Sequence, residues 1–328
     1  MLAIAFLGPR GTFAEQAART FAGAEGDSHD FVPVRTVPLA LTAVRDHEAE
    51  LACVPVENSV EGAVGATMDS LAVGRPLEAV AEVVLPIRFT VLVRPGTSAA
   101  QVRTVASHPH ALAQVQLWLD EHLPQAAPLA ATSTAAAAVG VLDGEFDAAV
   151  TAPVAAVHYP LSELATDVAD AADAVTRFFV VARPGRTPTP TGADRTSVVA
   201  VAERDRTGVL AEMLTELALR GINLTRIESR PLRSRFGEYR FYLDFDGHVA
   251  EQRVGDALAA LHRRCRELRF LGSYPRADRA ITGAEPGNTD ADYAAAADWL
   301  AGLRAAGQGE ERFAGTGSRS SSKPNTDR

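Results

Sequence analysis

Four short polar clusters stand where predicted strands end and predicted helices begin, and their side chains suit the binding of carboxylates. They are Gly8-Pro9-Arg10-Gly11-Thr12, Glu57-Asn58-Ser59, Ser107-His108-Pro109-His110 and Thr132-Ser133-Thr134. Hydroxyl, amide and free backbone N–H donors at a helix amino terminus attract anions, because the helix dipole favours negative charge there. Ligands of open α/β sheets bind at the carboxyl ends of strands, so the four clusters predict one anion-binding cleft. Each cluster taken alone could simply cap its own helix.

A fifth cluster, Thr176-Arg177-Phe178, lies at the entry to a strand predicted over 178–182. By itself this cluster is a weak signal, because a threonine at a strand start usually has no chemical role. An arginine near acidic residues usually forms a surface ion pair of little energetic consequence.

Several other chemistries lack their sequence signatures. His108 and His110 flank a proline with no cysteine or HExxH pattern nearby, so we expect no metal site. The chain contains no GxSxG elbow and no GxGxxG fingerprint, which leaves acyl transfer and dinucleotide binding without support.

The composition excludes further classes of function. The chain has 32 Lys and Arg against 41 Asp and Glu residues, and arginines dispersed in an acidic protein do not form a nucleic-acid footprint. The one lysine, Lys323, lies in a polar tail, which excludes Schiff-base chemistry and a P-loop. Cys53 and Cys265 suggest neither a disulfide framework nor a zinc site. No apolar stretch reaches the ~20 residues that a bilayer requires, so we expect a cytoplasmic protein without membrane association.

The first domain, predicted over residues 1–184, has an α/β pattern that could bring the five clusters together. Short apolar runs alternate with segments of helical spacing, for example strands 3–7, 51–56 and 104–107 and helices 12–22, 38–47 and 111–121. This alternation predicts helices that cover parallel sheets. Residues 185–195 are rich in proline, glycine and threonine and are predicted to be a linker.

The segment 196–275 predicts a second domain with the ferredoxin-like order β-α-β-β-α-β. Its predicted strands are 196–203, 222–229, 238–245 and 267–272, and its predicted helices are 207–219 and 250–264. Asn223 and the Glu228-Ser229-Arg230 turn would suit an amino-acid zwitterion, although asparagine after glycine is also common turn chemistry. We expect the tail, 276–328, to be largely disordered apart from one marginal helix over 293–303.

The five clusters in their order resemble the prephenate dehydratase family. The matching segments are GPRGTF at 8–13, PVENSVEG at 55–62, SHPHALAQ at 107–114, TSTAAAA at 132–138 and TRFFV at 176–180. The second domain, with TGVL at 207–210 and GINLTRIESRP at 221–231, resembles the ACT domain that follows the catalytic domain in this family. The resemblance implies a catalytic domain similar to periplasmic binding proteins, with lobe 1 at 1–80 and 160–184, lobe 2 at 81–159, and the active cleft between them.

The resemblance also implies a reaction that needs neither a cofactor nor a metal. Prephenate would lose its ring hydroxyl and its ring carboxylate together, giving phenylpyruvate, carbon dioxide and water. Because aromatisation drives this step, the protein needs only to hold two carboxylates and to assist a departing hydroxide. Thr176 is implied to be the catalytic hydroxyl, and we expect it to act as a polarising donor or a relay since threonine is a very weak acid.

The implied substrate-binding residues are Thr12, Asn58, Ser59, Ser107, His108, Ser133, Thr134 and Arg177. Arg177 would either bind substrate or brace the loop of Thr176. His110 stands where the family more often has glutamine, and we assign it no role.

The ACT resemblance implies phenylalanine binding at an interface between ACT domains, and therefore a homo-oligomer, either a dimer or a tetramer. The expected effector-binding residues are Gly208, Val209, Leu210, Asn223, Leu224, Glu228, Ser229 and Arg230. Two alternatives stay open at this point: an arogenate dehydratase, which acts on the amino analogue of prephenate, and a non-catalytic amino-acid sensor of the same fold.

Overall fold

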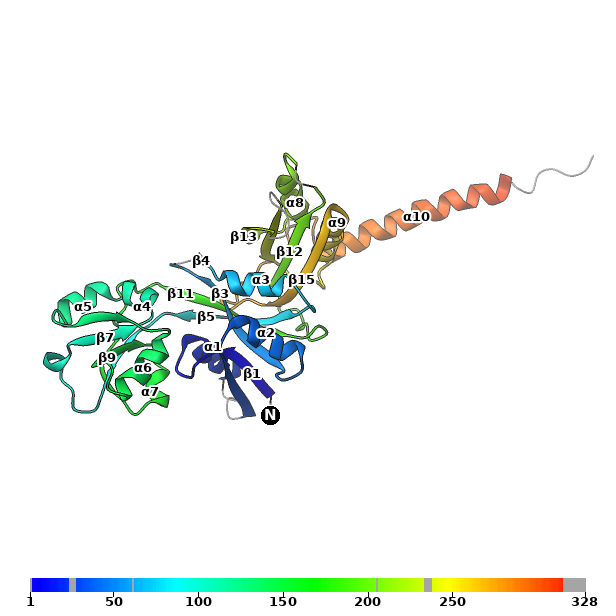
Figure 1. The fold of residues 1–328 in the computed structure, drawn as a ribbon. Coiled ribbons are helices and arrows are strands. Elements are labelled where there is room, and N and C mark those ends of the chain that lie inside the picture. The colour runs from blue at the N-terminus through cyan, green and yellow to red at the C-terminus, as the bar shows by residue number, and fades with distance from the viewer. Residues whose placement is uncertain (1, 24–27, 61, 205, 233–237, 315–328) are drawn as a thin grey trace, which may run out of the picture.

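Three β-sheets organise the chain into two neighbouring lobes and a C-terminal domain (Figure 1). The computed structural model describes residues 2–23, 28–60, 62–204, 206–232 and 238–314. This arrangement confirms the expected α/β class, with a two-lobed first domain followed by a smaller domain of β-α-β-β-α-β layout.

The first lobe is built on a mixed sheet with the strand order β2-β1-β3-β11-β5, and β4 is paired to β3. Its strands are β1 (Leu2–Leu7), β2 (His29–Val34), β3 (Leu51–Asn58), β4 (Gly62–Ala63), β5 (Glu78–Pro86) and β11 (Val175–Ala182). Its helices are α1 (Phe13–Ala22), α2 (Val37–Arg45) and α3 (Gly65–Leu71). The prediction of parallel strands is right for β1, β2 and β3 but wrong for β11, which returns from the second lobe and runs antiparallel to both β3 and β5.

The second lobe has a five-stranded sheet with the order β10-β6-β9-β7-β8. Its strands are β6 (Thr90–Val93), β7 (Thr104–Ser107), β8 (Ala127–Ala130), β9 (Ala148–Thr151) and β10 (Ser162–Thr166). Its helices are η2 (Ala99–Gln101), α4 (Pro109–Ala113), α5 (Gln116–His122), α6 (Thr134–Leu142) and α7 (Ala155–His158). The single helix predicted over 111–121 is two helices, because the Asp170 carboxylate accepts hydrogen bonds from the backbone N–H groups of Leu117 and Trp118 and caps a new helix start.

The chain crosses between the lobes later than the predicted boundaries near 80 and 160. β5 pairs with β11 along its whole length and therefore stays in the first sheet up to Pro86. β10 pairs with β6 and belongs to the second sheet. The connecting segments are consequently 87–89 and 167–174.

The C-terminal domain is a four-stranded antiparallel sheet with the order β13-β14-β12-β15. Its strands are β12 (Asp194–Ala202), β13 (Leu224–Pro231), β14 (Tyr239–Asp246) and β15 (Cys265–Pro275), and its helices are α8 (Val209–Ala218) and α9 (Gln252–Arg264). β12 begins inside the segment predicted as a linker, because Asp194 already pairs with Pro275.

The tail contains more structure than the sequence predicts. Helix α10 (Asp290–Ala314) has 25 residues, and it projects away from the three sheets (Figure 1). Its start is capped by Thr289, whose Oγ1 accepts a hydrogen bond from the Asp292 N–H at 3.2 Å. Residues 315–328, where disorder is predicted, lie outside the described residues. No helix in the described ranges is both long enough and apolar enough to span a bilayer.

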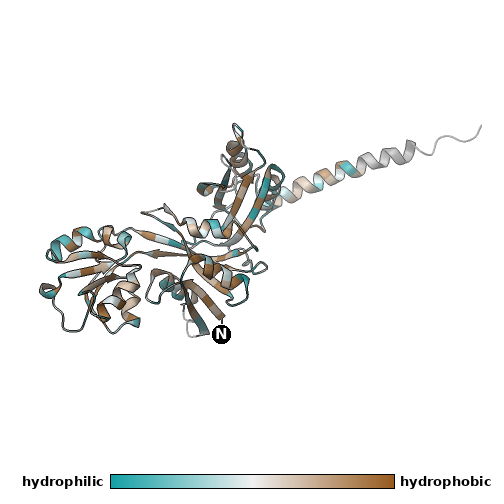
Figure 2. Cartoon of the chain, viewed as in Figure 1, coloured by the Kyte–Doolittle hydropathy of each residue, from teal (hydrophilic) through white to brown (hydrophobic). Residues whose placement is uncertain are grey.

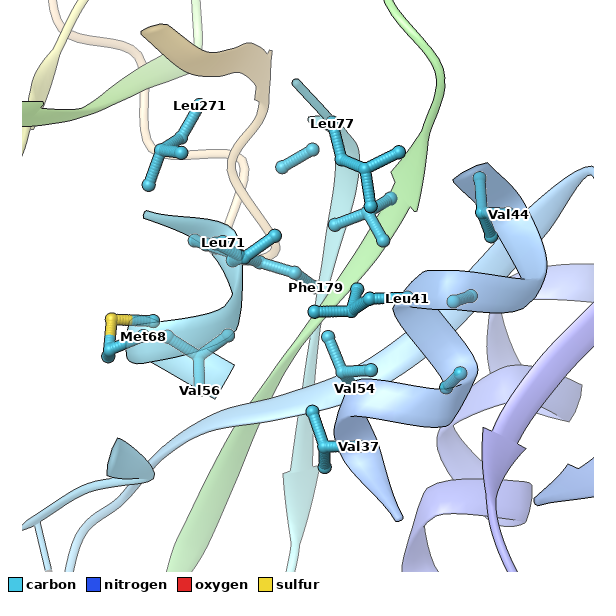
Figure 3. Close-up of a cluster of buried hydrophobic side chains, with 14 of the residues drawn as sticks. Val37, Leu41, Val44, Val54, Val56, Met68, Leu71, Leu77, Phe179 and Leu271 are labelled. Atoms are coloured by element: carbon cyan, nitrogen blue, oxygen red, sulfur yellow. The ribbon is translucent and has the colours of Figure 1, made fainter. Parts of the chain in front are cut away.

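One hydrophobic cluster joins the first lobe to the C-terminal domain. Phe179 of β11 and Leu271 of β15 lie in the same group of buried side chains as Leu41 of α2 and Leu71 of α3 (Figure 3). Hydrophobic residues follow the strands of both sheets, whereas α10 carries residues of both kinds (Figure 2). The two domains therefore share a core.

Gly272 marks the closest approach between these domains, and it supplies a test of the shared core. A Cβ at this position would lie 2.2 Å from the backbone oxygen of Ala79 in β5, and the φ angle of +126° is disfavoured for other residues. We expect Gly272→Ala to lower the free energy of unfolding by about 2 kcal/mol or more, measured by urea denaturation. Gly283→Ala, which meets no atom within 4 Å, is the control. Equal stabilities of the two variants would contradict the tight packing of β15 on β5.

Candidate functional site between the lobes

A cavity of about 400 Å³ lies between the lobes and gathers residues from all five polar clusters. Its volume falls in the range of small-molecule sites. The polar lining residues are Thr12, Arg35, Asn58, His108, His110, Gln114, Thr132, Ser133, Thr134 and Thr176. The apolar lining includes Phe13 and Phe89, whose rings pack edge to face at 5.5 Å, and Phe178. The cavity therefore combines hydrogen-bond donors with an aromatic wall.

Thr176 and Asn58 form the central polar pair of this cavity. They are direct partners in the β11–β3 ladder, and Asn58 Nδ2 lies 2.8 Å from Thr176 Oγ1. The Val60 N–H donates to Asn58 Oδ1 at 2.8 Å, which fixes the orientation of the amide and makes Nδ2 the donor to Thr176. Within the described part of the chain, Thr176 Oγ1 has no further hydrogen bond, so its hydroxyl proton can be donated into the cavity.

Most of the predicted substrate-binding residues line the cavity, and some of them also cap helices. Thr12, Asn58, His108, Ser133 and Thr134 are all lining residues. Ser133 Oγ accepts the Ala136 N–H at 2.9 Å and caps α6, yet it keeps its own proton to donate. Thr12 Oγ1 donates to the Leu7 carbonyl at 2.9 Å and caps α1, so its proton is already used. For Ser133 the capping interpretation and the binding interpretation are therefore compatible, whereas the Thr12 side chain has no proton left to donate to a carboxylate.

Two of the predicted substrate-binding serines do not line the cavity. Ser107 is fully buried, and its hydroxyl donates to the Val150 carbonyl at 2.6 Å, which ties β7 to β9. Ser59 exchanges two hydrogen bonds with Val175, one from its backbone N–H at 2.9 Å and one to its Oγ at 3.0 Å. Ser59 therefore holds the start of β11, immediately before Thr176.

Arg177 also lies outside the cavity, on the opposite face of β11. Its Nε contacts Glu82 at 2.7 Å, its Nη1 contacts Asp244 at 2.5 Å and its Nη2 donates to the Tyr274 hydroxyl at 2.8 Å. Burial disfavours the charged guanidinium, but Tyr274, Asp244 and Glu82 outweigh burial and raise the pKa of Arg177. The expectation that Arg177 binds substrate is not supported by this position, whereas the alternative of a brace for Thr176 fits it.

Several residues of the cavity are not among those expected from the sequence. Arg35 follows β2 and is the single Lys or Arg among the described lining residues. It also borders a neighbouring hollow together with Gly8 and Thr132. Gln114 lines the cavity, and its buried Oε1 has no hydrogen bond in the described structure. His110 also lines the cavity, although we assign it no role from the sequence. The rule that ligands gather at carboxyl ends of strands would have found Arg35, because β2 ends at Val34.

The two lobes are held together beside the cavity by Glu15 of α1. This carboxylate is fully buried and accepts from the Gly11 N–H at 2.6 Å and from Arg19 Nε at 2.9 Å. It also lies 2.7 Å from His158 Nε2 at the end of α7, in the second lobe. The loop that carries Thr12 is thus fixed to both lobes.

The predicted effector residues separate into two groups within one chain. Val209 borders a cavity of about 260 Å³ between α8 and α9, lined by charged side chains that include Arg206, Glu212 and Arg264. Arg230 instead reaches the first domain and contacts Asp69 of α3 at 3.0 Å, and it also contacts Glu228 at 3.4 Å. The remaining residues contact only the C-terminal domain or lie within its elements: Gly208 caps α8, Leu210 lies in α8, Asn223 donates to Asp246, and Leu224 and Ser229 lie in β13.

Known proteins resemble this chain over both domains. The prephenate dehydratase family matches residues 4–186, and the ACT domain family matches residues 196–263. A prephenate dehydratase of Amycolatopsis methanolica is 62% identical over 305 residues, which cover 93% of this chain and 98% of that protein.

Two solved structures are also similar. The prephenate dehydratase of Arthrobacter aurescens in complex with L-Phe has a TM-score of 0.87 and 45% identity, covering 92% of this chain and 99% of that chain. GqqA, described as a novel type of quorum quenching acylase, has a TM-score of 0.76 and 31% identity, covering 87% of this chain and 98% of that chain.

The lobe contact at Glu15 can be tested by stability. Glu15→Ala leaves the buried Gly11 N–H without its acceptor, so we expect the free energy of unfolding to fall by about 1–3 kcal/mol, measured by urea denaturation. Glu48→Ala removes an exposed carboxylate and is the matched control, with an expected change within about 0.5 kcal/mol. The same small change in both variants would show that Glu15 does not join the lobes.

Proposed function

This chain belongs to the prephenate dehydratase family, and from that premise we propose how its cavity performs the reaction. The enzyme converts prephenate to phenylpyruvate, carbon dioxide and water, a step of phenylalanine biosynthesis. We propose roles for individual residues in this conversion. The hydrogen bond between Asn58 and Thr176 is the observation that supports these roles most directly.

Thr176 assists the departure of the ring hydroxyl. As the bond to the ring carboxylate breaks, its electron pair enters the ring and the C–O bond on the opposite side of the ring breaks, so carbon dioxide and hydroxide leave. The Thr176 hydroxyl donates a hydrogen bond to the oxygen on which negative charge develops, where a preorganised donor is most effective. Because threonine is too weak an acid to give up its proton, the proton that completes the water comes through solvent or His108.

Asn58 makes Thr176 a better donor. A hydroxyl oxygen that accepts a hydrogen bond donates its own proton more strongly, because the two bonds polarise one another. The amide also occupies one lone pair of Thr176 Oγ1. Its role is to orient the catalytic hydroxyl in the direction of the cavity.

Arg35 binds one of the two carboxylates of prephenate. A dianionic substrate needs at least one strong counter-charge, and a guanidinium presents two parallel donors to a carboxylate. Ser133 and Thr134 lie at the start of α6, where free backbone N–H groups suit the second carboxylate. The rings of Phe13, Phe89 and Phe178 pack against the six-membered ring of the substrate.

Phenylalanine regulates the enzyme through the ACT domain, in a homo-oligomer that works in the cytoplasm. The support for the effector is the relative from Arthrobacter aurescens, whose structure contains L-Phe. The support for assembly is the edge strand β13, on which Ile227 is 43% exposed, and the start of the neighbouring β14, where Tyr239 is 46% exposed. Cys53 and Cys265 are both free thiols, which fits a reducing compartment.

The catalytic hydroxyl can be tested by two substitutions at one position. Thr176→Val keeps the shape but removes the donor, so we expect kcat for phenylpyruvate formation to fall by about 100- to 1,000-fold. Thr176→Ser keeps the hydroxyl and should retain most of the activity. The measurement is phenylpyruvate formation from prephenate by purified enzyme.

A parallel assay with arogenate tests the substrate. We expect prephenate to be turned over faster than arogenate by the unmodified enzyme. A large excess of activity on arogenate would reverse the substrate assignment, and full activity of Thr176→Val would disprove the role of the hydroxyl.

The role of Arg35 predicts a change in KM. Removing a charge-assisted hydrogen bond costs about 1.5–3 kcal/mol, so Arg35→Gln should raise KM for prephenate by about ten- to a hundredfold. Arg35→Lys should restore part of the affinity. The control is Arg10→Gln, because Arg10 donates to the Phe31 carbonyl of β2, the strand that precedes Arg35. An unchanged KM for Arg35→Gln would remove Arg35 from the substrate site.

A further inference from the structure

A buried cluster of charges lies where β11 of the catalytic domain meets the sheet of the ACT domain. Arg177 is 8% exposed, and its three partners come from three strands: Glu82 from β5, Asp244 from β14 and Tyr274 from β15. Ser197 of β12 donates to the second oxygen of Asp244 at 2.7 Å. Each of the three guanidinium nitrogens thus has one acceptor.

Arg177 and Asp244 of this cluster stay ionised in the folded protein. Burial would raise the pKa of Asp244, but Arg177 and Arg226 outweigh it and hold the pKa below its usual range. Burial raises the pKa of Tyr274, so its phenol stays neutral. The cluster therefore binds Arg177 through ion pairs with Glu82 and Asp244 and a phenol acceptor.

Arg177 directly follows Thr176 in β11, so its contacts restrain the backbone that carries the catalytic hydroxyl. Successive side chains of a strand point to opposite faces. Thr176 and Phe178 accordingly line the cavity, whereas Arg177 and Phe179 face the ACT domain. The Phe179 ring packs against Tyr274 at 5.3 Å and lies under the Arg177 guanidinium at 4.9 Å. A shift of the ACT strands must act on the backbone that carries Thr176.

The second member of the catalytic pair is connected in the same way. Glu57 immediately precedes Asn58 in β3, and its carboxylate lies 3.4 Å from Arg226 of β13. Arg226 in turn pairs with Glu228, one of the expected effector-binding residues. Both residues of the Asn58–Thr176 pair thus have a chain neighbour that an ACT strand contacts.

We propose that Arg177 is a positioning residue, through which the ACT domain sets the place of the Thr176 hydroxyl and phenylalanine alters turnover. This inference rests on the proposed function and names the route of its regulation. Phenylalanine can change the rate by this route only if it binds one arrangement of the Arg177 contacts more tightly than another. Arg226 and Glu228 connect the expected effector residues to this cluster.

Two buried phenols at the same interface provide a matched test. Tyr274→Phe removes the acceptor of Arg177 Nη2. Tyr242→Phe removes a hydroxyl that donates to the Met68 carbonyl at 3.1 Å and, within the described ranges, makes no hydrogen bond to Arg177. We expect Tyr274→Phe to lower kcat by about 2- to 30-fold at nearly constant KM, and to weaken the response to phenylalanine by a similar factor. Tyr242→Phe should keep kcat and the phenylalanine response within about twofold.

A second variant tests the ion pair between Arg177 and Asp244. Asp244→Asn keeps the shape of the side chain but removes its charge, and it should lower kcat and the phenylalanine response in the same direction as Tyr274→Phe. Thermal unfolding of the full chain shows which variants fold, and kcat and the phenylalanine response are compared among the folded variants. Wild-type enzyme must turn over prephenate and respond to phenylalanine, since failure of either would refute the proposed function itself.

The inference has its own contradicting results. If wild type responds but Tyr274→Phe and Asp244→Asn keep normal kcat and normal regulation, Arg177 does not position Thr176. Equal losses in Tyr274→Phe and Tyr242→Phe would show that the interface acts only as general packing, which also overturns the proposal.

Discussion

The return of β11 between β3 and β5 is the constraint on which the site depends. This strand is antiparallel to both neighbours and contributes one face to the cavity between the lobes and the other face to the ACT domain. Since side chains alternate along a strand, consecutive residues serve two different environments. Thr176 meets Asn58 and the substrate cavity, and Arg177 meets the regulatory sheet. A movement of β11 toward or away from the regulatory sheet therefore also moves the part of β11 that faces the cavity.

The energetics of Arg177 indicate why such a cluster has a positional role. Two charges taken out of water lose hydration that their mutual attraction only partly returns, so a buried ion pair is weak as a source of stability. The adjoining apolar cluster of Phe179, Leu271 and Tyr274 already holds the domains together through burial. The ion pairs add direction, because a planar guanidinium with three fixed acceptors has one orientation. The Thr176 hydroxyl, one residue away, must point toward the substrate, and a fixed orientation of Arg177 helps to hold it there.

Local sequence patterns predicted the α/β class, the second domain and several residues at strand ends that line the cavity, including Thr12, Asn58 and Ser133. The role of Thr176 came from the resemblance to the prephenate dehydratase family, because a threonine at a strand start is a weak signal by itself. The local patterns failed where distant segments decide the outcome. Ser107 has the right residue type at a strand end, but the Val150 carbonyl on β9 uses its hydroxyl. Arg177 could be placed only once the ACT strands were known to cover that face of β11. The lobe boundaries and the break between α4 and α5 depend in the same way on β11 and on Asp170, which lie far along the chain.

In the proposed route of regulation, the contacts of Arg177 and the Asn58–Thr176 pair move together. Crystal structures of this chain without and with phenylalanine would test it through two distances, from Arg177 Nη1 to Asp244 Oδ2, now 2.5 Å, and from Asn58 Nδ2 to Thr176 Oγ1, now 2.8 Å. We expect phenylalanine to change both distances, or to change the direction of the Thr176 hydroxyl together with the Arg177 contacts. Bound phenylalanine that inhibits the enzyme while both contacts keep their geometry would contradict it.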